Sequence, residues 1–172
     1  MSEGLVAQLV KSRKGLLFEG KHSVAMVSPS PAVPGHVWVL PKQETSILEN
    51  TPDFVVAEMF VIANRVSMAL FEGLGAQGTN MLIQNGTGAG QVLPHLILHV
   101  IPRSEQDGIE LLWQPKQLDE EAMSTVELKL KAEMGSVGVF EKEKPKPMEQ
   151  PKPEEIKSDA DNYQFRHLRR IP

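Results

Sequence analysis

The sequence between residues 80 and 103 constrains the fold of this chain more than any other part of it. Two apolar runs, 80–84 and 95–101, are separated by a loop that contains three glycines. Pro94 and Pro102 bracket the second run, and proline is rarely found inside a central strand. The pattern therefore predicts two strands joined by a glycine loop, with the two prolines marking the limits of the second strand.

Alternation along the second strand places its two histidines on one face. Successive side chains of a strand point to opposite faces, so His95, Ile97 and His99 share one face and the intervening leucines lie on the other. Two imidazoles then flank one aliphatic side chain, beside a glycine loop whose backbone N–H groups could hold an anion. The pattern predicts an anion site on this face. A metal site that combines both histidines with His36 is a second interpretation.

Four segments before the longest helical pattern predict a sheet and a short amphipathic helix. Two of them flank a Gly-Lys-His turn, which indicates a hairpin. A loop with three prolines leads into the last segment and cannot be helical. The segments are 2–13 for the helix, 16–19 and 24–27 for the hairpin, and 37–40 for a third strand.

Two further segments predict longer helices. In the first, Thr51 is the expected N-cap and Pro52 the first helical residue, and Gly73 and Gly75 end the helix. The side chains on its apolar face are those of Val55, Met59, Ile62, Val66 and Leu70. The second helix is expected from about residue 116 to Met134, where apolar residues recur at four-residue spacing.

Length and composition limit the class of protein. With 172 residues, of which 41% are hydrophobic, the chain can form one domain with a tail. Its net charge of −4 argues against a protein that coats nucleic acid, and the absence of cysteine excludes disulfides and thiolate zinc sites. No apolar run reaches the roughly 18 residues of a membrane span, and the N-terminus lacks a signal peptide. We expect a cytoplasmic protein without a membrane partner.

Composition shifts after the second long helix. Residues 141–160 contain four prolines, many charges of both signs and no aromatic residue, which is typical of an extended linker. Residues 161–172 instead interleave apolar and aromatic residues with arginines. We predict a domain at 1–138, a linker at 139–160 and a docking segment at 161–172. This segment could bind its own domain, a dimer mate or another protein, and RNA is the partner least favoured.

The glycine loop and the strand after it resemble the signature of the histidine-triad (HIT) family of nucleotide hydrolases and transferases. That signature is His-φ-His-φ-His-φ-φ, where φ is apolar, and this chain has Gly90-Gln91-x-x-x-His95-x-Ile97-x-His99-x-Ile101-Pro102-Arg103. The likeness extends upstream through Pro34-Gly35-His36 and Gly78-Thr79-Asn80. The resemblance implies an α+β fold, with an antiparallel sheet of about five strands, one long packed helix and a second helix after the signature strand. It also implies a homodimer and a purine nucleotide or other phosphate ligand, with no cofactor.

Three positions depart from the family pattern. Ile97 stands where the family has its middle histidine, which attacks the α-phosphorus and becomes nucleotidylated. Ser28 replaces an aspartate that accepts hydrogen bonds from the ribose, and Val92 replaces a serine or threonine that touches the phosphate. Loss of the nucleophile in a comparable triad costs about six orders of magnitude in kcat. The departures predict lost or reduced hydrolase activity.

The candidate site is a set of residues around a missing nucleophile. His95 and His99 are the remaining catalytic candidates. The resemblance gives the metal interpretation little support. The candidate nucleotide or phosphate ligands are Ser28, His36, Gln84, Asn85, Gly90, Gln91, His95 and His99.

Three functions remain open at this point. The first is nucleotide binding with lost or reduced turnover. The second is an active nucleotide phosphohydrolase or phosphoramidase with altered chemistry, which would use His99 or an activated water. The third is a dimeric interaction module that acts through residues 161–172, in which the histidines and amides only brace the glycine loop.

Overall fold

The computed structural model describes residues 5–135 of the chain. These residues all belong to one unit, Met1–Phe140. The predicted linker at 139–160 and docking segment at 161–172 lie outside the described residues. The division into a domain at 1–138, a linker and a docking segment therefore stays a prediction.

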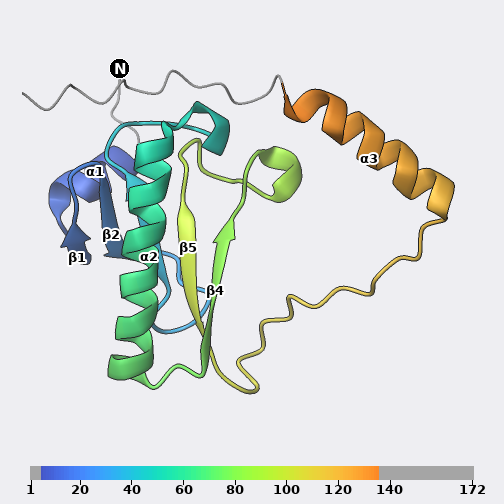
Figure 1. Cartoon of the computed structure of the whole chain (residues 1–172). Helices are drawn as coiled ribbons and strands as arrows, with labels where there is room; N and C mark the ends of the chain where they lie inside the picture. Colours follow the sequence, from blue (N-terminus) through green and yellow to red (C-terminus); the bar gives the residue numbers. More distant parts are fainter. Residues whose placement is uncertain (1–4, 136–172) are drawn as a thin grey trace, which may run out of the picture. The chain divides into compact units, whose positions relative to one another are not determined.

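The antiparallel sheet of five strands that the sequence predicts is present (Figure 1). Its strands follow the order β1-β2-β3-β5-β4, so that β1 and β4 are the two edge strands. The strand that follows the glycine loop thus lies between β3 and β4. The strands are β1 (Leu16–Glu19), β2 (Ser23–Val27), β3 (Val37–Pro41), β4 (Gly78–Ile83) and β5 (Leu98–Arg103).

The long helix α2 (Asp53–Leu74) packs along one face of this sheet (Figure 1). All five apolar residues predicted for its inner side are buried. The layer between α2 and the sheet contains more buried residues than the other core of the domain. Each buried side chain of this size contributes about 1.5–3 kcal/mol. The strand residues in this core are Ala25, Val37, Val39, Leu98 and Val100.

A second, smaller core lies on the opposite face of the sheet, where the predicted N-terminal helix is found. This helix is α1 (Leu5–Ser12), and its Val6 is buried. The other buried members of this core are Val24, Met26, Trp38, Leu40 and Ile97. Leu96 and Leu98 belong to the α2 core instead. The predicted alternation between His95 and His99 is thereby confirmed.

The predicted limits of the second signature strand are wrong. Strand β5 begins three residues later than expected, at Leu98, and it contains Pro102. The segment before it is drawn out of the ladder, because the Leu96 N–H donates to the Thr45 carbonyl at 2.7 Å. Pro102 is tolerated because the pairing with β3 ends at Val100, so that one side of the strand is already unpaired there.

The predicted N-cap of α2 is also wrong. The Thr51 hydroxyl donates to the Ile47 carbonyl at 3.2 Å, and no side chain caps the helix. Thr51 instead ends a short 3-10 helix, η1 (Leu48–Asn50). At the other end Gly75 stops α2 as predicted, in a left-handed conformation with φ +67°.

The helix predicted after the signature strand is α3 (Glu120–Met134), which begins about four residues later than expected. The Asp119 carboxylate fixes this start, because it accepts a hydrogen bond from the Ala122 N–H at 2.6 Å. The helix buries none of its residues.

Helix α2 is also the one described helix that is long and apolar enough to cross a membrane, by length and composition alone. The sequence analysis expected no apolar run of the length of a membrane span, and α2 departs from that expectation. The inner side of α2 forms the core of the sheet, and its outer side exposes Phe60, Met68 and Phe71. A core helix that is apolar on both sides gives the same composition.

Candidate functional site

A cavity of about 470 Å³ opens on the sheet face that carries His95, Ile97 and His99. Two further groups of side chains line it. The polar ones, with the two histidines, are Ser30, Gln84 and Gln91, and the apolar ones, with Ile97, are Pro29, Trp38, Val92 and Leu93. A second cavity of about 490 Å³ lies between α2 and strands β1 to β3, and its lining is apolar except for Arg65. The chemistry-bearing residues therefore gather in the first cavity.

The structure brings six of the sequence-predicted positions together in this cavity: Gln84, Gln91, Val92, His95, Ile97 and His99. Ser28, His36, Asn85 and Gly90 are not among the residues that line it. Sequence reasoning missed Ser30 and Trp38. A signal for Trp38 was present, since it lies two residues after His36 and therefore on the same face of a strand.

His36 and His99 form a hydrogen-bonded pair that fixes the tautomers of both rings. The Ala32 N–H donates to His36 Nδ1 at 3.1 Å, so that Nδ1 carries the lone pair of the neutral ring. Nε2 of His36 must then carry the hydrogen, and it donates this hydrogen to His99 Nδ1 at 3.0 Å. The hydrogen of His99 is left on Nε2. Within this relay (Ala32, His36 and His99), His99 therefore offers the cavity a donor and no lone pair.

The protonation states support this relay. Burial, and then the neighbouring His36, lower the pKa of His99 from 6.5 to about 4. Burial also lowers the pKa of His36. Both rings are therefore neutral near pH 7, as the chain of single hydrogens between them requires.

The His95 ring forms a hydrogen bond with a different group, the backbone carbonyl of Pro41. Its Nε2–H donates to the Pro41 carbonyl at 3.2 Å, and the side chain is buried. Burial lowers its pKa, which the Pro41 carbonyl and the charge of Glu44 partly offset. In the neutral ring the lone pair lies on Nδ1. His95 can thus accept a hydrogen bond from a ligand, and its own N–H is already used.

The three histidines do not form a metal site. Among residues 5–135 no group of three or more histidine, aspartate or glutamate side chains is arranged to hold a metal ion. His36 and His99 are directly bonded to each other, and His95 is bound to Pro41. The metal interpretation of the sequence has no structural support in the described residues.

Gln91 and Gly90 shape the glycine loop. The Gln91 amide accepts from the Gly86 N–H at 2.8 Å and donates to the carbonyls of Ser46 at 2.7 Å and Leu93 at 2.9 Å. Gly90 has φ +85°, and a Cβ there would lie 2.9 Å from the Gln84 side-chain nitrogen. Gly90 thus leaves room for the Gln84 amide. The Gln91 amide, in contrast, forms its hydrogen bonds with backbone groups.

Asn85 and Ser28 serve neighbouring backbone rather than the cavity. The Asn85 amide accepts from the Leu48 N–H at 2.9 Å and donates to the Glu49 carboxylate at 2.8 Å, which ties β4 to η1. The Ser28 hydroxyl accepts from the Ser30 N–H at 3.2 Å. It is Ser30 that reaches the cavity.

Ile97 and Trp38 form the apolar wall between the histidines. Ile97 is 8% exposed and belongs to the α1 core together with Trp38. The Trp38 ring meets the His99 ring edge-on, with the ring centroids 6.0 Å apart. Its Nε1–H is buried without a hydrogen-bond acceptor. The position between the two histidines is therefore filled by packing rather than by a polar group.

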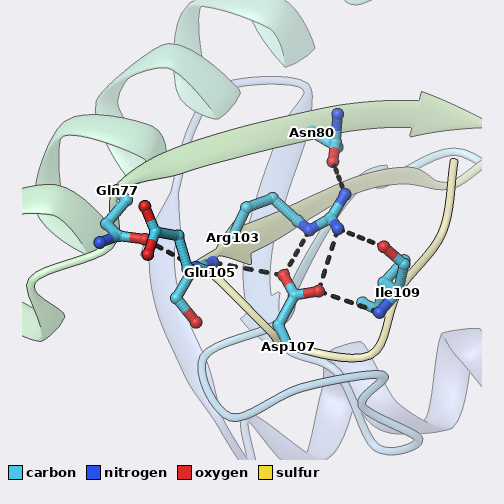
Figure 2. A network of polar contacts seen from close by, with 7 residues as sticks. Gln77, Asn80, Arg103, Glu105, Asp107 and Ile109 are labelled. Carbon is cyan, nitrogen blue, oxygen red and sulfur yellow. Dashed lines mark hydrogen bonds and ion pairs between the residues drawn. The ribbon is translucent and has the colours of Figure 1, made fainter. Parts of the chain in front are cut away.

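Arg103, the last residue of the signature, holds the chain that leaves β5 (Figure 2). Its guanidinium donates to both Asp107 oxygens, at 2.6 and 3.0 Å, and also to the Asn80 side chain and the Ile109 carbonyl. The arginine keeps the pKa of Asp107 well below its usual range. This network uses the charge of Arg103 outside the cavity.

Several known proteins are similar to this chain in sequence. A family model described as the HIT domain matches residues 11–106, which is more than half of the chain. The chain belongs to the HIT domain family. It is 35% identical over 102 residues to adenylylsulfatase HINT3 of Arabidopsis thaliana, a match that covers 59% of this chain and 50% of that protein. It is 32% identical over 92 residues to the bis(5′-nucleosyl)-tetraphosphatase (asymmetrical) of Schizosaccharomyces pombe, with 54% and 50% covered.

Solved structures of this family show the same fold. The histidine triad nucleotide-binding protein from Candida albicans has a TM-score of 0.70 at 23% identity, and the match covers 79% of this chain and all of that one. The predicted α+β fold is thus confirmed. The chain spans about half the length of the two relatives from Arabidopsis thaliana and Schizosaccharomyces pombe.

The buried histidines predict how stability depends on pH. For His99 the pKa is about 4 in the folded chain and 6.5 in the unfolded chain, so the unfolded chain binds more protons between these values. The free energy of unfolding should therefore fall as the pH is lowered from 6.5 to 4. The His99→Asn variant keeps an acceptor for the His36 N–H and should show a shallower fall. Urea unfolding at pH 7, 6 and 5 measures both slopes, and equal slopes would contradict the assignment.

Proposed function

We propose that this HIT domain binds a purine nucleotide or another phosphate ligand in the cavity of about 470 Å³ and has lost or reduced hydrolase activity. One observation carries the proposal: Ile97, rather than a histidine, lines the cavity together with His95 and His99. The binding part is supported by the names of the relatives, which are hydrolases of nucleotides or a nucleotide-binding protein.

His99 is a poor substitute for the missing nucleophile. Nucleophilic attack on phosphorus needs a lone pair within about 3–3.5 Å of the reacting atom. In the relay, the lone pair of His99 is occupied by the His36 N–H and only the Nε2–H faces the ligand. The same N–H is a suitable donor for a phosphate oxygen. His99 therefore takes part in binding.

His95 is excluded for a different reason. Its lone pair lies on Nδ1, the ring nitrogen next to the backbone, and its side chain is only 6% exposed. It also lies two residues before position 97, in the segment that precedes β5. A ligand placed for attack by the family's middle histidine is out of its reach.

Gln84 is the second ligand-binding residue of the proposal. It lines the cavity, and Gly90 leaves space for its amide. In contrast, the amides of Asn85 and Gln91 are occupied by the neighbouring backbone and by Glu49. We assign these two residues, with His36 and Ser28, to the support of the site.

A homodimer is the assembly that the surface favours. Strand β4 is an edge of the sheet, and the side of α2 above it is anchored by the contact between Ser67 and Thr79, at 2.7 Å. Phe60 and Phe71 project from this side of α2, and both are exposed. An open edge strand beside an apolar helix side is a typical place for two copies to join.

Binding is tested first. A thermal-shift series with AMP, GMP, CMP, adenosine and inorganic phosphate should show stabilisation by a nucleoside monophosphate that exceeds the effect of adenosine or phosphate alone. A ligand at about 100 times its Kd adds roughly 2.7 kcal/mol to the free energy of unfolding, or several degrees in Tm. The His99→Asn variant should lose most of this shift. No shift with any compound would contradict nucleotide binding.

Turnover is tested by restoring the histidine. The Ile97→His variant should gain hydrolysis of an adenosine 5′-phosphoramidate, because it returns a ring nitrogen to the position between His95 and His99. Ile97→Asn is the matched control, since it is polar but not nucleophilic, and it should stay inactive. High activity of the unaltered chain would sink the idea that its turnover is reduced.

The dimer is tested at Phe71, which is 66% exposed. A Phe71→Glu substitution should shift the protein from dimer to monomer in sedimentation, because it places a charge in the proposed interface. Leu128→Glu on α3 is the control at an equally exposed residue, 69%, outside that surface. An unaltered chain that sediments as a monomer would refute the assembly.

A further inference from the structure

Given that the cavity binds a nucleotide, as proposed, we infer that it selects phosphoryl groups with one negative charge over those with two. A phosphodiester, or a phosphomonoester that keeps one proton, is then the preferred class of ligand. A fully ionised nucleoside monophosphate is a weaker one. The selection would arise because uncharged polar groups line the cavity and would have to bind a charged ligand.

The polar lining of the cavity is electrically neutral. Among the described residues, its lining contains no lysine, arginine, aspartate or glutamate. The polar side chains are one hydroxyl, two amides and two imidazoles. They belong to Ser30, Gln84, Gln91, His95 and His99.

Several charged side chains of the described residues have partners of their own. Lys42 and Arg13 both pair with Glu19, and Glu49 holds Asn85. The charge of Glu44 acts on His95. Around His99 itself, β3 contributes Trp38 and β4 contributes Leu82 as its cross-strand neighbours. Within residues 5–135, the titratable group that contacts it is His36.

The relay also prevents His99 from becoming a cation easily. A bound anion normally raises the pKa of a histidine beside it. Here the second proton would have to enter at Nδ1, where the His36 Nε2–H already donates at 3.0 Å. His36 cannot turn its hydrogen away without losing the Ala32 N–H bond at Nδ1. Protonation of His99 therefore requires the relay to break, and the cavity stays neutral.

A neutral cavity disfavours a doubly charged ligand strongly. The cost of removing an ion from water grows with the square of its charge, so a dianion costs about four times as much as a monoanion in the idealised Born treatment. Neutral donors recover part of this cost, whereas a lysine or arginine would recover more.

The test compares AMP with its 5′-methyl ester, a phosphodiester that carries one charge at every pH used. The second ionisation of a phosphomonoester has a pKa of about 6, so roughly 1% of AMP is singly charged at pH 8 and most of it at pH 5.5. In calorimetry with the full chain, the Kd of AMP should rise at least about tenfold from pH 5.5 to pH 8. The Kd values of the methyl ester and of adenosine should stay constant.

A charge introduced at the rim provides an independent test. Val92 lines the cavity and is 88% exposed, so its replacement does not disturb the core. Val92→Lys should tighten AMP binding at pH 8 and abolish its preference for low pH. Val92→Gln is the matched neutral control and should keep the preference of the unaltered chain.

The outcomes separate this inference from the proposed function. If AMP binds at pH 8 as tightly as its methyl ester, or more tightly, nucleotide binding stands and the selection of single charge is wrong. If neither compound binds at either pH, both are wrong. Tighter binding of the methyl ester at pH 8, with the two compounds nearly equal at pH 5.5, is the result expected.

Discussion

The hydrogen bond between His36 and His99 decides what this site can do. It joins the proline-rich loop before β3 to strand β5, and the Ala32 N–H fixes its direction. Because each neutral ring carries one hydrogen, the Ala32 N–H determines which nitrogen of His36 is protonated, and His36 in turn determines which nitrogen of His99 is protonated. The last member of the relay therefore presents a donor. His99 can therefore donate to an anion in the proposed site, and it cannot act there as a base.

Ile97 belongs to the same arrangement. It lies in the α1 core with Trp38, whose ring edge meets His99. A histidine at position 97 would place a polar ring against this apolar wall, which costs free energy unless its hydrogen bonds are met. The aliphatic residue stabilises the wall and removes the nucleophile in one change. The proposed loss of turnover and the apolar packing would thus both follow from the same side chain.

The sequence predicts the local features of this fold well and the long-range ones poorly. Alternation of apolar residues gave the faces of β5, and Gly75 gave the end of α2, because both depend on neighbours in the chain. The errors arose where distant backbone groups compete. The Leu96 N–H donates to the Thr45 carbonyl instead of pairing in the sheet, and the Asn85 amide accepts from the Leu48 N–H of η1. No pattern within the signature contains those partners, so only the structure reveals the hydrogen bonds of Asn85 and Gln91.

The most direct test of the relay is the tautomer of His99, read from the nitrogen-15 shifts of its ring at pH 7. The structure predicts a neutral ring with the hydrogen on Nε2 and a bare, hydrogen-bonded Nδ1. The His36→Ala variant should release this preference, because the donor to Nδ1 is then gone. A hydrogen on Nδ1, or a doubly protonated ring at pH 7, in the unaltered chain would contradict the relay and with it the view of the cavity as a neutral donor site.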